Sequence, residues 1–261
     1  MATDADRLAL RLRLDELLQR HAELSDRLAM GQKNFQRLAR SVWRVQEEER
    51  RRFARELHDG VGQNLTALLR LIADAQAEAE AAQPATPTLM QTLHQAHALT
   101  ESTWQDTRTL SRLLRPQILD DLGLEPALRW LVRSIATEHG PQFRIDLPAA
   151  LPELDSERST LVFRVVQEAL ANAERHAGAK QVSVQLAQRQ GRLRVRVEDD
   201  GRGCNPDDAW QAGSSGRSSG LGGMRDRVQL FGGEVRIETR PGAGFIVMLD
   251  LPLADAETEE G

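Results

Sequence analysis

The sequence of 261 residues has a single cysteine and no long apolar run. Cys204 has no second cysteine to pair with, which excludes an internal disulfide and favours a reducing compartment. No stretch of about 18 apolar residues occurs, which argues against a membrane-spanning helix. The N-terminal segment MATDADRLAL also lacks the basic and then apolar layout of a signal peptide. These absences predict a globular, cytoplasmic protein with no transmembrane segment.

The charge balance offers no broad positive surface. The net charge is -5, which provides no electrostatic footprint for direct nucleic acid binding or for an anionic membrane. A basic cluster at residues 50–52 is local, and Glu47 and Glu48 stand four positions before Arg51 and Arg52. That order favours ion pairs along a helix, so the cluster is interpreted as a solvated helix face.

The first third of the chain has the pattern of a long helix. Residues 7 to about 80 contain no proline and only three glycines. Apolar positions recur at alternating spacings of three and four, the coiled-coil period, which predicts a coiled-coil helix over residues 1–45 that pairs with a second copy. The register shifts by one residue before Phe53, either as a point where a signal changes the packing or, more simply, as an accommodation between straight-helix and supercoil periods. The repeating series is Leu10, Leu14, Leu17, His21, Leu24, Leu28, Gly31, Phe35, Leu38, Val42 and Val45.

A proline-containing break divides this helix from a second one. Residues 81–88, AAQPATPT, interrupt the pattern, and residues 89–114 resume it, which predicts an antiparallel hairpin. One hairpin leaves an apolar seam exposed, so we expect a homodimer that buries it in a four-helix bundle. The segment from Arg115 to Leu131 then turns into a further helix with Pro126 in its first turn, and we place the domain boundary at residues 116–123.

The second half mixes strands with helices. We expect one long helix at residues 157–176, a short helix at 224–231, and a turn at 241–244. This order predicts an α/β layer in which helices cover one face of a sheet. The expected strands cover residues 143–147, 181–186, 193–198, 234–238 and 245–251.

The segment ELHDGVGQ, residues 56–63, carries a possible nucleophile. On an ideal helix His58 borders the apolar stripe and faces outward. One ring nitrogen of a neutral imidazole can attack phosphorus while Asp59 accepts the other N–H and takes the proton. Gln63 could orient a water, although it lies roughly 140° from His58 around an ideal helix. An exposed histidine without chemistry is the alternative for this segment taken alone.

The segment EALANAERHA, residues 168–177, carries polar groups suited to a magnesium nucleotide. Glu168, Asn172 and His176 recur at intervals of four, which places them on one helix face. Magnesium that keeps several waters and bridges phosphates needs few protein oxygens, and an asparagine carbonyl near a glutamate meets that need. An ordinary polar helix face is the alternative.

The loop after the strand LRVRVE suits an adenine ring. Asp199 can accept a hydrogen bond from an exocyclic amine, and Gly201 and Gly203 let the backbone turn tightly and approach a flat ring. Residues 213–223, GSSGRSSGLGG, feed the next helix, where backbone N–H groups could cradle phosphates. The tract could equally be a linker, since its spacing matches no common phosphate-binding loop.

In this order the motifs resemble those of two-component sensor histidine kinases that partner NarL/LuxR-type response regulators. ELHDGVGQ resembles the phosphoacceptor box, RPQILDDLGL the exit of the second helix, and QEALANAERHAGA, DDGRG and GLGGMRDRV the nucleotide-binding boxes. The resemblance covers roughly residues 46–253. It implies a multidomain α and α+β protein, with a coiled coil and a dimeric four-helix bundle followed by a Bergerat-type α/β sandwich that binds ATP.

The resemblance also implies domains and residue roles. The domains would be the coiled coil at 1–45, a histidine phosphotransfer hairpin at 46–120, the ATP-binding domain at 121–254 and an acidic tail at 255–261. His58 would be phosphorylated with Asp59 as base, Asn172 would bind Mg²⁺, and DGVGQ up to Gln63 matches a phosphatase pattern. The response regulator's receiver domain would accept the phosphoryl group on an aspartate. The residues implied to bind ATP are Glu168, Asn172, Arg175, His176, Asp199, Gly201, Gly203, Gly220, Leu221 and Gly222.

The chain departs from the family pattern at two places, and two other functions remain open. Ser218 replaces a glycine before the GL pair, which could alter closure of the loop, and Phe245 replaces a threonine whose hydroxyl could reach the nucleotide region. A serine kinase of the anti-sigma type would use the same ATP-binding fold, but the ELHDG segment argues against it. A nucleotide-binding coiled-coil scaffold without catalysis is the alternative outside enzymes.

Overall fold

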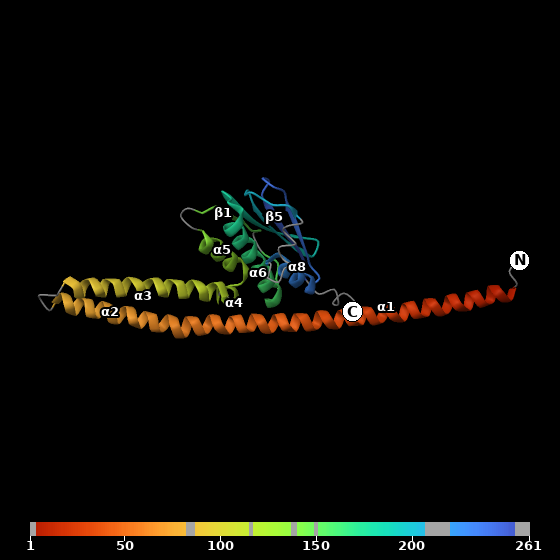
Figure 1. Ribbon diagram of the computed structural model, residues 1–261, viewed down its shortest axis with the longest axis horizontal. Coiled ribbons are helices and arrows are strands. Elements are labelled where there is room, and N and C mark those ends of the chain that lie inside the picture. Colours follow the sequence, from red (N-terminus) through yellow and green to blue (C-terminus); the bar gives the residue numbers. More distant parts are fainter. Residues whose placement is uncertain are drawn as a thin grey trace. The chain divides into compact units, whose positions relative to one another are not determined.

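The computed structural model describes residues 4–81, 87–114, 117–136, 140–148, 151–206 and 220–253. The chain forms two compact units, residues 1–45 and 46–261. The first unit is entirely helical in its described residues, and the second holds the rest of the helices and the sheet (Figure 1).

Helix α1, Asp4–Glu56, confirms the long helix expected from the sequence. Its apolar series within the first unit is exposed in the single chain, as the exposed fractions of Leu28 (74%) and Phe35 (70%) show. Exposed side chains of this size at coiled-coil spacing need a partner surface to leave water. Among the helices that the structure describes, none combines the length and apolar character needed to cross a bilayer.

The helical hairpin begins where α1 gives way to a short π-helical segment, η1, Leu57–Gly62. Helix α2, Gln63–Ala81, and helix α3, Pro87–Leu114, then pack along each other, as Figure 1 shows. The buried hydroxyl of Ser111 donates to the carbonyl oxygen of Ala54 at 2.7 Å and ties the end of α3 to α1. The predicted antiparallel pair of helices is confirmed. Several large apolar residues of the hairpin stay exposed: Phe53, Val61, Leu68, Leu71, Leu89, Leu99 and Leu110.

Two helices lead from the hairpin into the sheet-containing part. Helix α4 is Gln117–Asp121 and helix α5 is Leu124–Ile135, with Pro126 in the first turn of α5 as expected. Gly123 has a φ of 85°, a conformation open to glycine, at the turn between them. Helix α5 buries one apolar face, and Asp120 pairs with Arg51 at 2.6 Å.

The sheet has five strands in the order β1-β2-β3-β5-β4. Strand β1 pairs parallel with β2, and the other neighbours are antiparallel. Alternate residues such as Val182, Val195 and Leu249 are buried, because successive side chains in a strand point to opposite faces. Helices α5, α6 and α8 cover one face (Figure 1), which confirms the predicted α/β layer. The strands are β1 Gln142–Asp146, β2 Gln181–Arg189, β3 Arg192–Asp199, β4 Glu234–Thr239 and β5 Phe245–Pro252.

Helix α6, Ser156–Asn172, is the central helix of this layer. The carboxylate of Asp155 accepts from the backbone N–H of Arg158 at 2.7 Å and caps its first turn. Its apolar residues pack against α5, α8 and β3, with Leu161, Val162, Phe163 and Val166 fully buried. A second π-helical segment, η2, Ala173–Ala177, continues it, and helix α8, Gly220–Leu230, packs alongside.

A buried ion pair joins the end of α1 to α6. Arg164 donates to both carboxylate oxygens of Glu47, with Nη2 at 2.8 Å from Oε2, and both side chains are at most 7% exposed. The guanidinium also donates to Gln167 Oε1 at 2.8 Å and to the carbonyl oxygen of Leu114. The guanidinium of Arg164 on α6 thus bonds to residues of α1, α3 and α6 itself, which links the hairpin to the sheet layer.

Removing the charge of Glu47 leaves Arg164 buried without its counter-ion. We expect Glu47→Gln to lower the free energy of unfolding by about 3 kcal/mol, because breaking one partner of a buried ion pair leaves an uncompensated charge. Glu49→Gln is the matched control, since Glu49 pairs with the exposed Arg52 and should cost about 0.5 kcal/mol. Urea denaturation followed by circular dichroism measures both, and equal losses would contradict the prediction.

Candidate active site

Asp199 ends strand β3 and is 8% exposed. Its Oδ1 accepts from the backbone N–H of Gly201 at 2.9 Å. Burial raises the pKa of this carboxyl above its ordinary value of 3.8, and the nearby charge of Asp200 adds to the rise, while N–H groups of Gly201 and Phe245 oppose it. A carboxylate held in this environment is an acceptor that gains from an additional donor.

Asp200 has a different role, although it is adjacent. Its Oδ1 accepts from the backbone N–H groups of Lys180 at 2.7 Å and Gln181 at 2.9 Å. The bond from Gln181 contributes most to lowering the pKa of the Asp200 carboxyl. This side chain therefore fastens the loop to the start of β2.

The glycines of the loop are required by neighbouring backbone. A Cβ on Gly201 would lie 2.4 Å from the carbonyl oxygen of Ala177, and one on Gly203, whose φ is 56°, would lie 2.1 Å from that of Arg240. The loop is thus held between the end of η2 and the β4–β5 turn, where Gly244 N–H donates to Gly201 O at 3.0 Å. The predicted tight turn is confirmed, and its close approach is to the protein's own backbone.

Glu168 and Asn172 are half-buried on α6, one turn apart. A Cβ on Gly220 would lie 1.6 Å from Glu168 Oε1, so the first turn of α8 lies directly against this side chain, which would have to move to admit a larger residue. Leu221 and Gly222 follow in that turn and are half-buried. The structure therefore brings the predicted carboxylate and the GLGG segment together.

The residues predicted to follow Asn172 on the same face fall in a different helix type. Asn172 ends the α-helix, and Arg175 and His176 lie in η2, where both are exposed. Glu168 and Asn172 lie one turn apart on α6, and His176 follows in η2. Its role at the nucleotide therefore stays a prediction.

Two residues near the site escaped sequence reasoning. Arg227 on α8 has its pKa lowered by burial and by nearby Arg50, while Glu168 opposes the shift. Its spacing of seven from Gly220, which keeps one helix face, was an available signal. Buried Thr239 donates to Gly244 O at 2.8 Å and accepts from Cys204 N at 3.1 Å, a contact across the turn that no local pattern shows.

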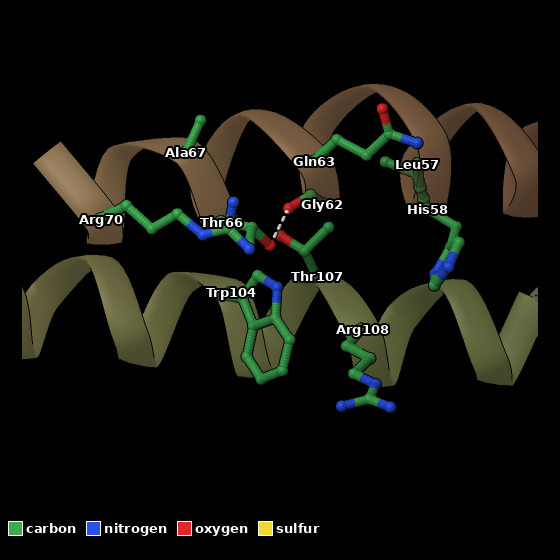
Figure 2. A pocket seen from close by; sticks show the side chains of 10 residues that line it. All are labelled: Leu57, His58, Gly62, Gln63, Thr66, Ala67, Arg70, Trp104, Thr107 and Arg108. Atoms are coloured by element: carbon green, nitrogen blue, oxygen red, sulfur yellow. Dashed lines mark hydrogen bonds between the residues drawn. The ribbon is translucent and has the colours of Figure 1, made fainter.

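His58 and Gln63 line one cavity between the two helices of the hairpin (Figure 2). The expected angle of roughly 140° between them holds for an ideal α-helix, whereas η1 is a π-helix, whose hydrogen bonds join residues five apart. Asp59 is exposed and is not among the lining residues. The structure thus brings His58 together with Gln63 and leaves Asp59 outside the cavity.

The described residues fit a metal that is bound mainly by its nucleotide. Among them, no group of three or more His, Cys, Asp or Glu side chains could hold a metal ion alone. Asn172 and Glu168 supply oxygens beside the start of α8, which suits Mg²⁺ carrying waters and phosphates. Residues 213–219, including Ser218, lie outside the described residues. Phe245 stands directly opposite Asp199 in the β3–β5 register, so that departure adjoins the buried carboxylate.

Two known protein families match this chain, one over the sheet-containing region and one over the helical hairpin. Residues 157–255 match the family described as Histidine kinase-, DNA gyrase B-, and HSP90-like ATPase. Residues 49–119 match the family described as Histidine kinase. The first range holds Asn172 and Asp199, and the second holds His58 and Gln63.

Two curated proteins are similar to most of this chain. The chain is 37% identical over 211 residues to the sensor histidine kinase MctS of Rhizobium johnstonii, a match that covers 80% of this chain and 44% of that protein. It is 34% identical over 216 residues to the oxygen sensor histidine kinase NreB of Staphylococcus carnosus, covering 81% of this chain and 58% of that protein. The chain therefore spans about half the length of the curated relatives it matches.

Among solved structures, the histidine kinase domain of the Erythrobacter litoralis EL346 blue-light activated histidine kinase is similar at 22% identity and a TM-score of 0.45. That match covers 73% of this chain and 94% of that one, and its score gives it no weight in the assignment. The assignment rests on two family matches in the expected order, together with relatives above 30% identity. The chain belongs to the histidine kinase family.

Proposed function

We propose that this protein uses ATP to phosphorylate its own His58 and then transfers the phosphoryl group to an aspartate of a NarL/LuxR-type response regulator. The observation that carries the proposal is the presence, in one chain, of a histidine in the cavity of the hairpin and a buried carboxylate in the ATPase region. The serine-kinase alternative loses support, because residues 49–119 match a histidine kinase model.

Asp199 recognises adenine in this proposal. Ionised Asp199 is poorly solvated in the fold, so a hydrogen bond from an exocyclic amine compensates part of its desolvation. The glycines of the loop hold the carboxylate at the edge of the layer, with Gly201 and Gly203 closely packed on neighbouring backbone. Adenine binding therefore uses a position that the fold has already built.

The first turn of α8 and the end of α6 bind the phosphates. The backbone N–H groups at Gly220, Leu221 and Gly222 begin an 11-residue helix and carry its positive end. Asn172, beside Glu168, would hold Mg²⁺, which supplies charge neutralisation on the phosphate oxygens when bound. We also assign Arg175 and His176, in the exposed segment η2 that follows α6, to ATP binding.

The chemistry at His58 is an in-line displacement. A lone pair on one imidazole nitrogen forms the N–P bond while the bond from the γ-phosphorus to the β-bridging oxygen breaks and ADP leaves with that electron pair. The proton on the other ring nitrogen passes to Asp59. Gln63 shares the cavity with His58, and we assign it to orienting water for the dephosphorylation of the regulator.

We further propose a homodimer built from the hairpin and the N-terminal helix. The exposed apolar residues of α1, α2 and α3 support this, because burying them needs a second copy of the same surface. In this assembly residues 1–45 form the coiled coil, 46–120 the phosphotransfer bundle and 121–254 the ATP-binding domain. Residues 255–261 would be an acidic tail.

His58→Gln tests the phosphoacceptor. We expect it to abolish the acid-labile, base-stable label obtained with γ-labelled ATP and Mg²⁺, because the amide lacks a nucleophilic lone pair on nitrogen, and to leave ATP binding unchanged. The matched control is His94→Gln, an exposed histidine on α3 whose Nδ1 lies 2.7 Å from Met90 O, which should keep the label. Acid-labile label on the His58→Gln protein would show that another residue is phosphorylated.

Asp199→Asn should change the stability of the protein and its affinity for ATP in opposite directions. The folded pKa of Asp199 is raised, so the stability that this carboxyl contributes is present below pH 3.8 and is lost as the pH rises through the folded pKa. At pH 7 the neutral asparagine removes the cost of burying the charged carboxylate, so we expect a higher Tm than the parent. The difference in Tm should narrow as the pH is lowered through the raised pKa of Asp199 toward 3.8.

The same substitution should weaken ATP binding by about 10- to 100-fold, the usual consequence of losing a charge-assisted hydrogen bond. Calorimetric titration and thermal melts measure the two effects, with the exposed Glu238→Gln as the control that changes neither. A lower Tm for Asp199→Asn at pH 7 would refute the proposed cost of the carboxylate.

A further inference from the structure

The cavity that holds His58 also holds two arginines. It has a volume of about 400 Å³, and Figure 2 shows side chains reaching it from both helices. Residues of η1 and α2 form one wall, and residues of α3 form the other. The lining consists of Leu57, His58, Gly62, Gln63, Thr66, Ala67, Arg70, Trp104, Thr107 and Arg108. The lining of a single cavity therefore includes His58 and two arginines, Arg70 and Arg108.

The charge of this cavity is of one sign. Arg70 comes from α2 and Arg108 from α3, so a permanent cation stands on each wall. None of the described lining residues is acidic. Thr66 directs its hydroxyl to Gly62 O at 2.8 Å, the dashed line in Figure 2, and Gln63 adds an amide. Such a lining favours an anion over a neutral or cationic ligand.

Trp104 positions one of these cations. The guanidinium carbon of Arg108 lies 5.0 Å from the centre of the Trp104 ring, within the range of a cation–π interaction. The α3 wall of the cavity is well packed at this point, because Thr107 is buried and its hydroxyl donates to Thr103 O at 2.8 Å. Stacking engages the face of a guanidinium, which leaves its in-plane N–H donors available to an anion.

We propose that this cavity is the phosphoryl subsite of the hairpin, in which Arg108, with Arg70 on the facing wall, binds the oxygens of the phosphoryl group carried by His58. The inference rests on the proposed phosphorylation of His58 and adds the residues that bind the transferred group. A phosphoryl group is a tetrahedral anion with three acceptor oxygens, which a guanidinium fork matches. Neutralising charge on those oxygens is the main contribution a protein makes to phosphoryl transfer.

The first test compares Arg108→Gln and Arg108→Lys with Arg129→Gln, a control arginine whose ion pair with Glu125 lies on α5. At saturating ATP and Mg²⁺ we expect Arg108→Gln to phosphorylate His58 about 10- to 100-fold more slowly, the loss of a hydrogen bond to a charged group. Arg108→Lys keeps the charge and should lose less, and Arg129→Gln should match the parent. The affinity for ATP should be the same in all four proteins.

The second test reads the phosphoryl group itself. In ³¹P NMR of the phosphorylated proteins, the second pKa of the phosphoryl group should be higher in Arg108→Gln than in the parent, because a nearby cation favours the dianion. Arg108→Lys should fall between them and, as a conservative variant, guards against a loss of folding. An unchanged rate and pKa, or an ATP affinity that falls with the rate, would overturn the subsite. A parent protein that takes no label on His58 would instead defeat the proposed function.

Discussion

The packing of helix α6 is the constraint on which the rest of the second unit depends. Its apolar residues are buried against β3, α5 and α8, and its N-terminus is capped by Asp155. The same helix carries Arg164, which meets Glu47 of α1, and Glu168, which meets the start of α8. Because one helix carries these contacts, the residues proposed to bind the nucleotide and the ion pair to the hairpin are fixed relative to each other.

The two halves of the proposed reaction have opposite environments. Asp199 is buried and bonded to backbone, with a pKa raised by desolvation, while His58 is exposed in a cavity lined by long side chains. A ring that must be recognised in one orientation suits a site built into the fold. A nucleophile that has to meet both ATP and a second protein needs an accessible position, and the hairpin provides one.

Local patterns predicted most of the elements and failed where the helix period changed. The strands at residues 193–198 and 245–251 and the helix at 89–114 agree with β3, β5 and α3 within a few residues. The angle between His58 and Gln63 and the face of His176 were calculated for 3.6 residues per turn, whereas η1 and η2 are π-helical. Gly60 and Gly62 lie within the segment that the sequence predicted as helix, and their presence does not show which helix type forms there.

The sequence by itself determined the order of helices and strands and the residue types at the site, since periodicity and turn residues act over a few positions. Only the tertiary structure decided that Glu47 pairs with Arg164, that Gly201 packs on Ala177, and that Arg108 lies in the cavity of His58. Those contacts join residues up to 117 positions apart. Their burial depends on how helices and sheet pack, which no local pattern contains.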